Sequence, residues 1–176
     1  MIPFLNLMGY LPLGQPYNSA PWNYSGSESV TAIPNSDIID WVLVELRKTT
    51  GDVTTAMPDS TIDMKAGFLL KNGTITGLDG VSPLRLITPF TGNLYVVIWH
   101  RNHLGVISDS PLVETGGVYS YDFTSDANQA YGSSYVIKEV NTGIWAVMSG
   151  DALNDTKINN EDKNEVWVNE NSNSGY

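Results

Sequence analysis

The sequence contains no cysteine and only two histidines among its 176 residues. Without cysteine the chain forms no disulfide, uses no thiol nucleophile and offers no thiolate to a metal. Basic residues are also scarce, with 9 lysines and arginines against 19 aspartates and glutamates, which gives a formal net charge of −10. Because an acidic surface repels nucleic acids and anionic membranes, neither is expected as a partner. The same charge suits calcium and neutral ligands such as glycans.

Long hydrophobic runs are missing as well. No stretch approaches the roughly 18 uninterrupted apolar residues of a membrane-spanning helix, so we expect no membrane insertion. The first residues also lack the basic segment that opens a signal peptide. Either the chain is cytoplasmic or it belongs to a longer exported protein. The Asn- and Ser-rich residues after position 168 favour the second alternative, and with it an extracellular or cell-surface location.

The abundance of glycine and proline indicates β-structure. The sequence has 16 glycines and 9 prolines, and only 16% of its residues are charged. This composition is typical of a chain with many short strands and turns rather than of a helical bundle. We therefore expect an all-β fold, an antiparallel β-sandwich of the Ig-like or jelly-roll kind, over residues 1–149. Residues 150–176 are expected to add a calcium-binding loop and a short helix.

Two segments carry the strongest strand patterns, residues 38–47 and 93–100. The first is apolar on both faces, which indicates a central, buried strand. Asn72-Gly73, between two strand-like runs at 64–70 and 74–76, predicts a β-hairpin. One helix is expected, at about 160–168. Shorter strands are predicted at 28–33, 84–87, 105–108, 119–123, 135–138 and 144–148.

The residues from 151 to 162 have the spacing of a calcium loop. If Asp151 is position 1, oxygen-bearing side chains fall at positions 1, 5, 9 and 12, and position 7 supplies a backbone carbonyl. Leu153 and Thr156 depart from the pattern, because an Asp or Asn is usual at position 3 and a Gly at position 6. The alternative is an acidic turn that caps a helix, with Asn159 or Asn160 as the N-cap. The predicted ligands are Asp151, Asp155, Lys157, Asn159 and Asp162.

Several phrases of the sequence together resemble a known type of module. They are Leu-Pro-Leu-Gly-Gln-Pro-Tyr at 11–17, the segments 40–47, 68–76 and 95–106, and the Gly-Asp to Val-Trp tail at 150–167. The set resembles the hemagglutinin-like or dockerin-like module of large secreted or surface proteins of Bacteroidetes-type bacteria. The resemblance implies an extracellular, non-catalytic module beside enzymes or adhesins. It also implies that residues 150–176 correspond to one half of a dockerin, which is too little to imply cohesin binding.

Aromatic residues offer a second candidate site, for a glycan. Aromatic faces stack on sugar rings while a few polar groups fix the orientation. Four residues form this predicted set, although each is also a candidate for ordinary packing: Trp22, Tyr24, Tyr17 and Trp99. Trp41 and Trp145, within apolar strands, are expected in the core instead.

His100 and His103 offer a third candidate, a transition-metal site with Asp109 as a third ligand. The alternative is a hydrogen-bonded corner between two strands.

Glu45 and Arg47 are unusual charges in the central strand, and they indicate either a strand end that reaches solvent or a polar ligand-binding patch. Neither a nucleophile motif nor a phosphate-binding glycine loop is present.

These observations favour a non-catalytic extracellular binding or adhesion module, with a glycan as the leading ligand class. The first alternative is a structural or assembly module that packs against neighbouring modules or self-associates. The second is a metal-dependent enzyme centred on His100 and His103.

Overall fold

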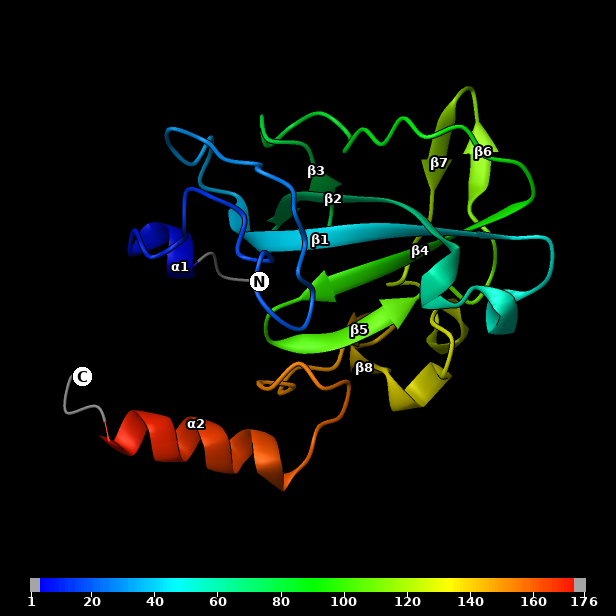
Figure 1. The fold of residues 1–176 in the computed structure, drawn as a ribbon. Helices are drawn as coiled ribbons and strands as arrows, with labels where there is room; N and C mark the ends of the chain where they lie inside the picture. Colours follow the sequence, from blue (N-terminus) through cyan, green and yellow to red (C-terminus); the bar gives the residue numbers. More distant parts are fainter. Residues whose placement is uncertain (1–3, 173–176) are drawn as a thin grey trace.

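The computed structural model describes residues 4–172, and its main element is one antiparallel sheet of five strands (Figure 1). The spatial order of the strands is β3-β2-β1-β4-β5. Their bounds are β1 Ile38–Thr49, β2 Thr61–Leu70, β3 Ile75–Thr76, β4 Asn93–His100 and β5 His103–Ile107. Two separate hairpins follow: β6 Val113–Thr115 with β7 Val118–Ser120, and β8 Ile137–Asn141 with β9 Ile144–Val147.

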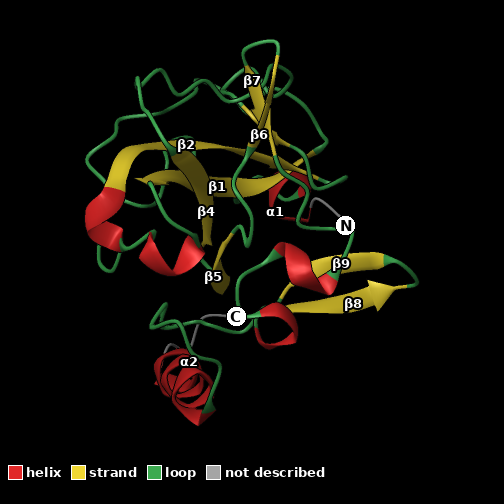
Figure 2. Cartoon of the chain, turned by 90° about the vertical axis from the view of Figure 1, so that its right-hand side faces the viewer, coloured by secondary structure: helices red, strands yellow, loops and turns green. Residues whose placement is uncertain are grey.

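Helices are short and few among the described residues. Helix α1 spans Phe4–Leu7 and α2 spans Asn160–Ser172. Four single turns of 3-10 helix lie in the loops: η1 Val53–Thr55, η2 Pro58–Ser60, η3 Ala127–Gln129 and η4 Ser133–Tyr135. No helix within this part of the chain is both long and apolar enough to cross a membrane. Figure 2 shows α2 lying apart from the sheet.

Strand β1 is central because its residues are apolar on both faces. It pairs antiparallel with β2 on one side and with β4 on the other. Trp41 and Leu43 are completely buried on one face, while Val42 and Val44 are buried on the other. The prediction of a central strand from residue 38 is confirmed, as are strand 93–100 and the hairpin at Asn72-Gly73.

Each face of the sheet has its own apolar cluster. On the first face, Trp41, Leu43 and Phe68 pack beneath the N-terminal segment, which contributes Leu11 and Tyr17. In Figure 1 this segment, drawn in blue, crosses in front of β1. On the other face, Val106 of β5 packs with Ala130 and Ile137 in a smaller cluster that Trp145 and Val147 flank. One face of the sheet is therefore covered by the N-terminal segment, and the β4–β5 end of the other face is covered by residues between 123 and 147.

The structure corrects the predicted strands at 28–33 and 84–87. Ser29 forms only an isolated bridge with Gly14, and Pro83 forms one with Thr76. The described residues thus form one five-stranded sheet and two hairpins, and the expected second sheet of a sandwich is not among them. The predicted helix is present and is longer than expected, extending to Ser172.

Candidate metal centre

The predicted calcium loop follows β9 and is fixed to the sheet before it begins. The Gly150 N–H donates to the Asn102 carbonyl at 3.0 Å, and the Leu104 N–H donates to the Met148 carbonyl at 3.0 Å. Between them His103 and Ser149 form an antiparallel bridge. The loop therefore leaves from the β4–β5 turn, and it leads directly into α2.

Three carboxylates converge inside this loop. One oxygen from each of Asp151, Asp155 and Asp162 lies within 4.8 Å of the other two. Within the part of the chain that the structure describes, this is the one group of three or more His, Asp or Glu residues close enough to share an ion. Asp151 and Asp162 are only 2% and 4% exposed, whereas Asp155 is exposed. The spacing read from the sequence thus corresponds to a real convergence in space.

Backbone amides hold the two buried carboxylates in place. Asp151 accepts from the Asp155 N–H at 3.0 Å and from the Thr156 N–H at 3.1 Å. Asp162 accepts from the Leu153 N–H at 3.1 Å and from the Asn159 N–H at 2.8 Å. An ionised carboxylate has about four acceptor positions, so both side chains keep capacity for a cation.

The backbone of the loop has the conformation of a calcium loop even at position 6, where the sequence departs from the calcium-loop pattern. Thr156 occupies the position at which Gly is usual, and it adopts a left-handed φ of +70°. A left-handed conformation costs a residue with a Cβ about 1–2 kcal/mol. Asn154 also has a positive φ, +55°, which asparagine tolerates well. Leu153, at position 3, is 40% exposed and contributes no side-chain oxygen.

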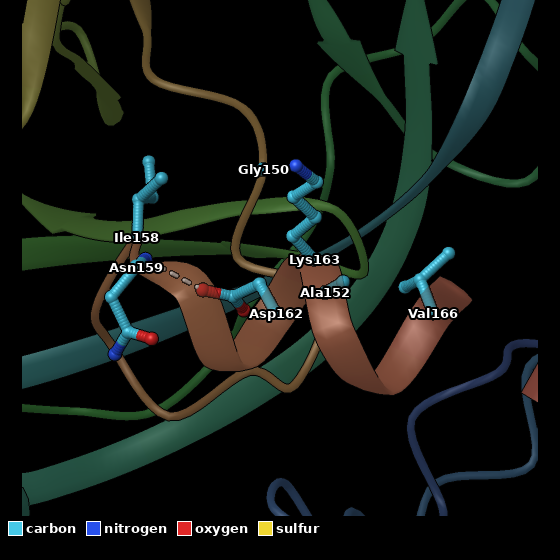
Figure 3. A pocket seen from close by; sticks show the side chains of 7 residues that line it. All are labelled: Gly150, Ala152, Ile158, Asn159, Asp162, Lys163 and Val166. Carbon is cyan, nitrogen blue, oxygen red and sulfur yellow. Dashed lines mark hydrogen bonds between the residues drawn. The ribbon is translucent and has the colours of Figure 1, made fainter. Parts of the chain in front are cut away.

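The start of α2 shows that the helix-capping alternative is realised in the same residues. The Asn159 side chain accepts from the Glu161 N–H at 2.5 Å, and Asp162 accepts from the Asn159 N–H in return (Figure 3). Asn159 is thus the N-cap of α2, and the bond from its N–H to Asp162 is one half of a capping box. The Lys157 N–H donates to Asp155 Oδ1 at 3.0 Å, and its side chain is exposed. Predicted ligand Asn159 therefore already spends one lone pair on the cap.

The electrostatics of the loop favour a cation. Burial raises the pKa of Asp151, and the neighbouring charges of Asp162 and Asp155 raise it further, although two backbone N–H donors oppose the shift. The pKa of Asp162 is lowered, chiefly by the N–H groups of Asn159 and Leu153. Repulsion within the cluster therefore falls mainly on Asp151. The ligand atoms that the three carboxylates offer are all oxygens, which suits hard divalent cations such as calcium, magnesium or manganese.

A shallow hollow lies beside the loop, between it and the first turns of α2 (Figure 3). Its wall is mostly apolar, and its lining residues are Gly150, Ala152, Ile158, Asn159, Asp162, Lys163 and Val166. Asp162 thus faces both the carboxylate cluster and this hollow.

The predicted aromatic set does not form an exposed platform. Tyr17 is completely buried, and its hydroxyl donates to the Trp41 carbonyl at 2.8 Å. Its prediction as a ligand-binding residue is wrong, because no face of its ring reaches solvent. Trp22 packs edge-on against Tyr17 with ring centroids 4.9 Å apart. These two rings help the N-terminal segment cover the sheet.

The other two aromatic residues are also held by packing. Tyr24 donates its hydroxyl to Glu28 at 2.6 Å, and its ring packs against the first core cluster. The Trp99 indole N–H donates to Glu45 at 2.7 Å. Its ring lies so close to Gly105 that a Cβ there would meet ring atoms at 2.3 Å. Trp41 is buried, as expected, and Trp145 is partly buried against the second cluster.

The two histidines face each other across the turn between β4 and β5. Their rings are perpendicular with centroids 4.5 Å apart, and the two Nδ1 atoms are 2.9 Å apart. The predicted third ligand, Asp109, is not grouped with them. Instead, Asp40 of β1 contacts His100, with Oδ2 3.2 Å from Nε2. Sequence reasoning missed Asp40, although a lone carboxylate within Ile-Ile-Asp-Trp-Val was a signal that it needed a partner.

Glu45 and Arg47 form a buried ion pair rather than a strand end in solvent. Arg47 Nε lies 2.6 Å from Glu45 Oε1, and the two side chains are 11% and 5% exposed. Trp99 donates to the same carboxylate. These charges are therefore part of the interior and not a patch open to a ligand.

Comparisons with known proteins supply no template for these sites. No protein-family model, curated protein or solved structure matches the chain. The assignment of function therefore depends on geometry and donor chemistry.

Proposed function

We propose that this chain is a non-catalytic module whose C-terminal loop binds one calcium ion and thereby fixes α2 to the β-rich body. The observation that carries the proposal is the convergence of Asp151, Asp155 and Asp162 within 4.8 Å, with two of the three carboxylates buried. An ion between them would neutralise the repulsion at Asp151 and join both ends of the loop.

Calcium suits the loop better than its competitors. Calcium accepts six to eight oxygens in flexible geometry, so carbonyls and water can complete the shell around three carboxylates. Magnesium demands near-ideal octahedral geometry at shorter distances and gives up its water reluctantly. The irregular backbone around Asn154 and Thr156 favours the more tolerant ion.

The number of ligands also indicates where such a module works. Leu153 supplies no side-chain oxygen at position 3, and Asn159 is engaged in the helix cap. Sites with fewer charged ligands bind weakly, and calcium sites of extracellular modules have Kd values of about 0.1–1 mM. A site of this class is filled only where calcium is abundant, which supports placement in an exported, extracellular protein.

Calorimetry and thermal unfolding test the calcium proposal. If Kd is about 0.1–1 mM, then 10 mM calcium stabilises the fold by about 1.4–2.7 kcal/mol. Asp162→Asn and Asp151→Asn should abolish this gain, and Asp59→Asn, an exposed carboxylate outside the loop, is the matched control. No stabilisation by calcium, or a calcium response that survives Asp162→Asn, would show that the loop is only a helix cap. Equal stabilisation by magnesium would overturn the assignment of the ion as calcium.

For the partner of the module we propose a glycan as the leading ligand class, supported by the acidic, β-rich character of the chain. Tyr17 is completely buried, and Trp22, Tyr24 and Trp99 are half-buried, so exposed aromatic residues are tested first. A polysaccharide panel in calcium tests this role, with Tyr10→Ala and Tyr135→Ala as surface variants because their side chains are 67% and 85% exposed. Failure to bind any polysaccharide would remove it.

A specific observation favours the assembly alternative. The two hairpins outside the main sheet carry exposed apolar side chains, namely Val113, Val118, Tyr119, Val140 and Ile144. Such side chains on short, otherwise unpaired hairpins suit packing against a neighbouring module or a second copy. Concentration-dependent sedimentation that Val140→Lys abolishes would support this role, and a monomer at all concentrations would exclude self-association.

A further inference from the structure

The turn between β4 and β5 holds a second group of metal-binding side chains, separate from the carboxylate loop. His100 ends β4 and His103 begins β5, and the two residues are register partners across a turn of only Arg101 and Asn102. The tight turn brings both imidazoles to one place, with their Nδ1 atoms 2.9 Å apart.

The hydrogen bonds around His100 assign its tautomer. The Asn102 N–H points at His100 Nδ1 from 3.2 Å, so this nitrogen is an acceptor. The proton of the ring is then on Nε2, from which it is donated to Asp40 Oδ2 at 3.2 Å. His103 must therefore supply the hydrogen between the two Nδ1 atoms.

Asp40 is held firmly for this role. It is 6% exposed, and its Oδ1 accepts from the Trp41 N–H at 2.8 Å and from Arg101 Nη2 at 2.5 Å. In a metal-binding histidine, the ring nitrogen that faces away from the metal usually donates its N–H to a carboxylate, which fixes the tautomer and the orientation of the ring.

We propose that His100 and His103 bind a divalent transition metal through their two Nδ1 atoms, with Asp40 as the positioning residue behind His100. Two nitrogens that each lie about 2.05 Å from a metal are about 2.9 Å apart when they subtend a right angle, and about 3.3 Å apart at the tetrahedral angle. The observed spacing fits the right angle, which Cu(II) and Ni(II) prefer over Zn(II).

Binding requires only small changes in this turn. His103 moves its ring proton from Nδ1 to Nε2, and the ion replaces the long contact from the Asn102 N–H. Within the described residues no third His, Asp or Glu joins the pair, so water or an external ligand completes the coordination shell.

The proposal is tested with the full, untagged, metal-free chain in saturating calcium, titrated with Cu(II) by calorimetry. We expect one bound Cu(II) whose electron paramagnetic resonance spectrum shows coupling to two nitrogens. His100→Ala and His103→Ala should each remove saturable binding. Asp40→Asn should weaken it about 10–100-fold. Asp109→Asn is the control, and it should leave Cu(II) binding unchanged.

A second measurement needs no variant. In the unaltered protein labelled with 15N-histidine, Zn(II) should shift both Nδ1 resonances together, and the resonances of the bound state should show a proton on both Nε2 atoms. Copper without nitrogen coupling, equal affinity in His103→Ala, or unmoved Nδ1 resonances would each show that the pair is a hydrogen-bonded corner only. Because calcium is held at saturation, failure here leaves the carboxylate loop untouched.

Discussion

The interior position of Glu45 gives a prediction whose size follows from its contacts. The side chain is 4% exposed, and its carboxylate accepts from Arg47 Nε at 2.6 Å and Trp99 Nε1 at 2.7 Å. It also accepts from the Thr61 hydroxyl. Glu45→Ala would leave a guanidinium and an indole N–H without this acceptor inside the core.

Breaking a buried ion pair by removing one partner costs about 3–5 kcal/mol, because the remaining charge is left uncompensated. Arg47 keeps one other bond, from Nη1 to the Ala56 carbonyl at 3.2 Å, so the lower half of that range is expected. Urea unfolding followed by tryptophan fluorescence measures the change. Glu45→Ala combined with Arg47→Ala should regain part of the loss, since the double variant buries no lone charge.

The pH dependence provides a second measurement on the same residue. Burial of Glu45 raises its pKa, but the hydrogen bonds from Arg47, Thr61 and Trp99 outweigh that effect and lower it overall. A carboxylate with a lowered pKa stabilises the fold above its unfolded-state pKa and loses that contribution as pH falls through its folded-state value. In Glu45→Ala, the free energy of unfolding should therefore fall less steeply as the pH is lowered. If Glu45→Ala lowers the free energy of unfolding at neutral pH by less than about 1 kcal/mol, which is typical of an exposed ion pair, the buried network is refuted.

Three further predictions concern single positions. Thr156→Gly relieves a left-handed β-branched residue and should stabilise the calcium-bound protein by about 1 kcal/mol in urea unfolding; destabilisation would contradict the φ of +70°. Gly105→Ala places a Cβ 2.3 Å from the Trp99 ring and should cost about 1–3 kcal/mol, whereas Gly14→Ala, with no atom within 4 Å, should cost almost nothing. Calcium affinity should fall as pH falls through the raised pKa of Asp151, because protons then compete for the ligand; a flat calorimetric profile would contradict this.

The sequence predicted correctly the strands and the turn whose formation depends on neighbouring residues in the chain. Strands β1 and β4 have apolar periodicity over eight residues or more, and Gly73 meets the positive φ that its hairpin turn requires, +89°. The carboxylates of the metal centre were predictable for the same reason. All three lie within one short loop, whose backbone amides bring Asp151 and Asp162 together.

Features that depend on distant parts of the chain were not predictable. Residues 28–33 have strand-like composition, but they lie against the sheet as a covering segment, and only Ser29 forms a bridge. Tyr17 was predicted as a ligand-binding residue, yet its hydroxyl donates to the carbonyl of Trp41, which lies 24 residues further along the chain. Asp40 and His100 likewise meet only because β1 and β4 are neighbours in the sheet.

The attachment of the loop to the β4–β5 turn has a mechanical consequence. Any pull on α2 passes through residues 151–162 before it reaches the Gly150–Asn102 and Leu104–Met148 hydrogen bonds. An empty loop can straighten first, toward an extended length of about 40 Å. A loop closed by an ion cannot, so the load goes at once to the edge of the sheet. Calcium would then determine how far the chain between the sheet and α2 can extend under force.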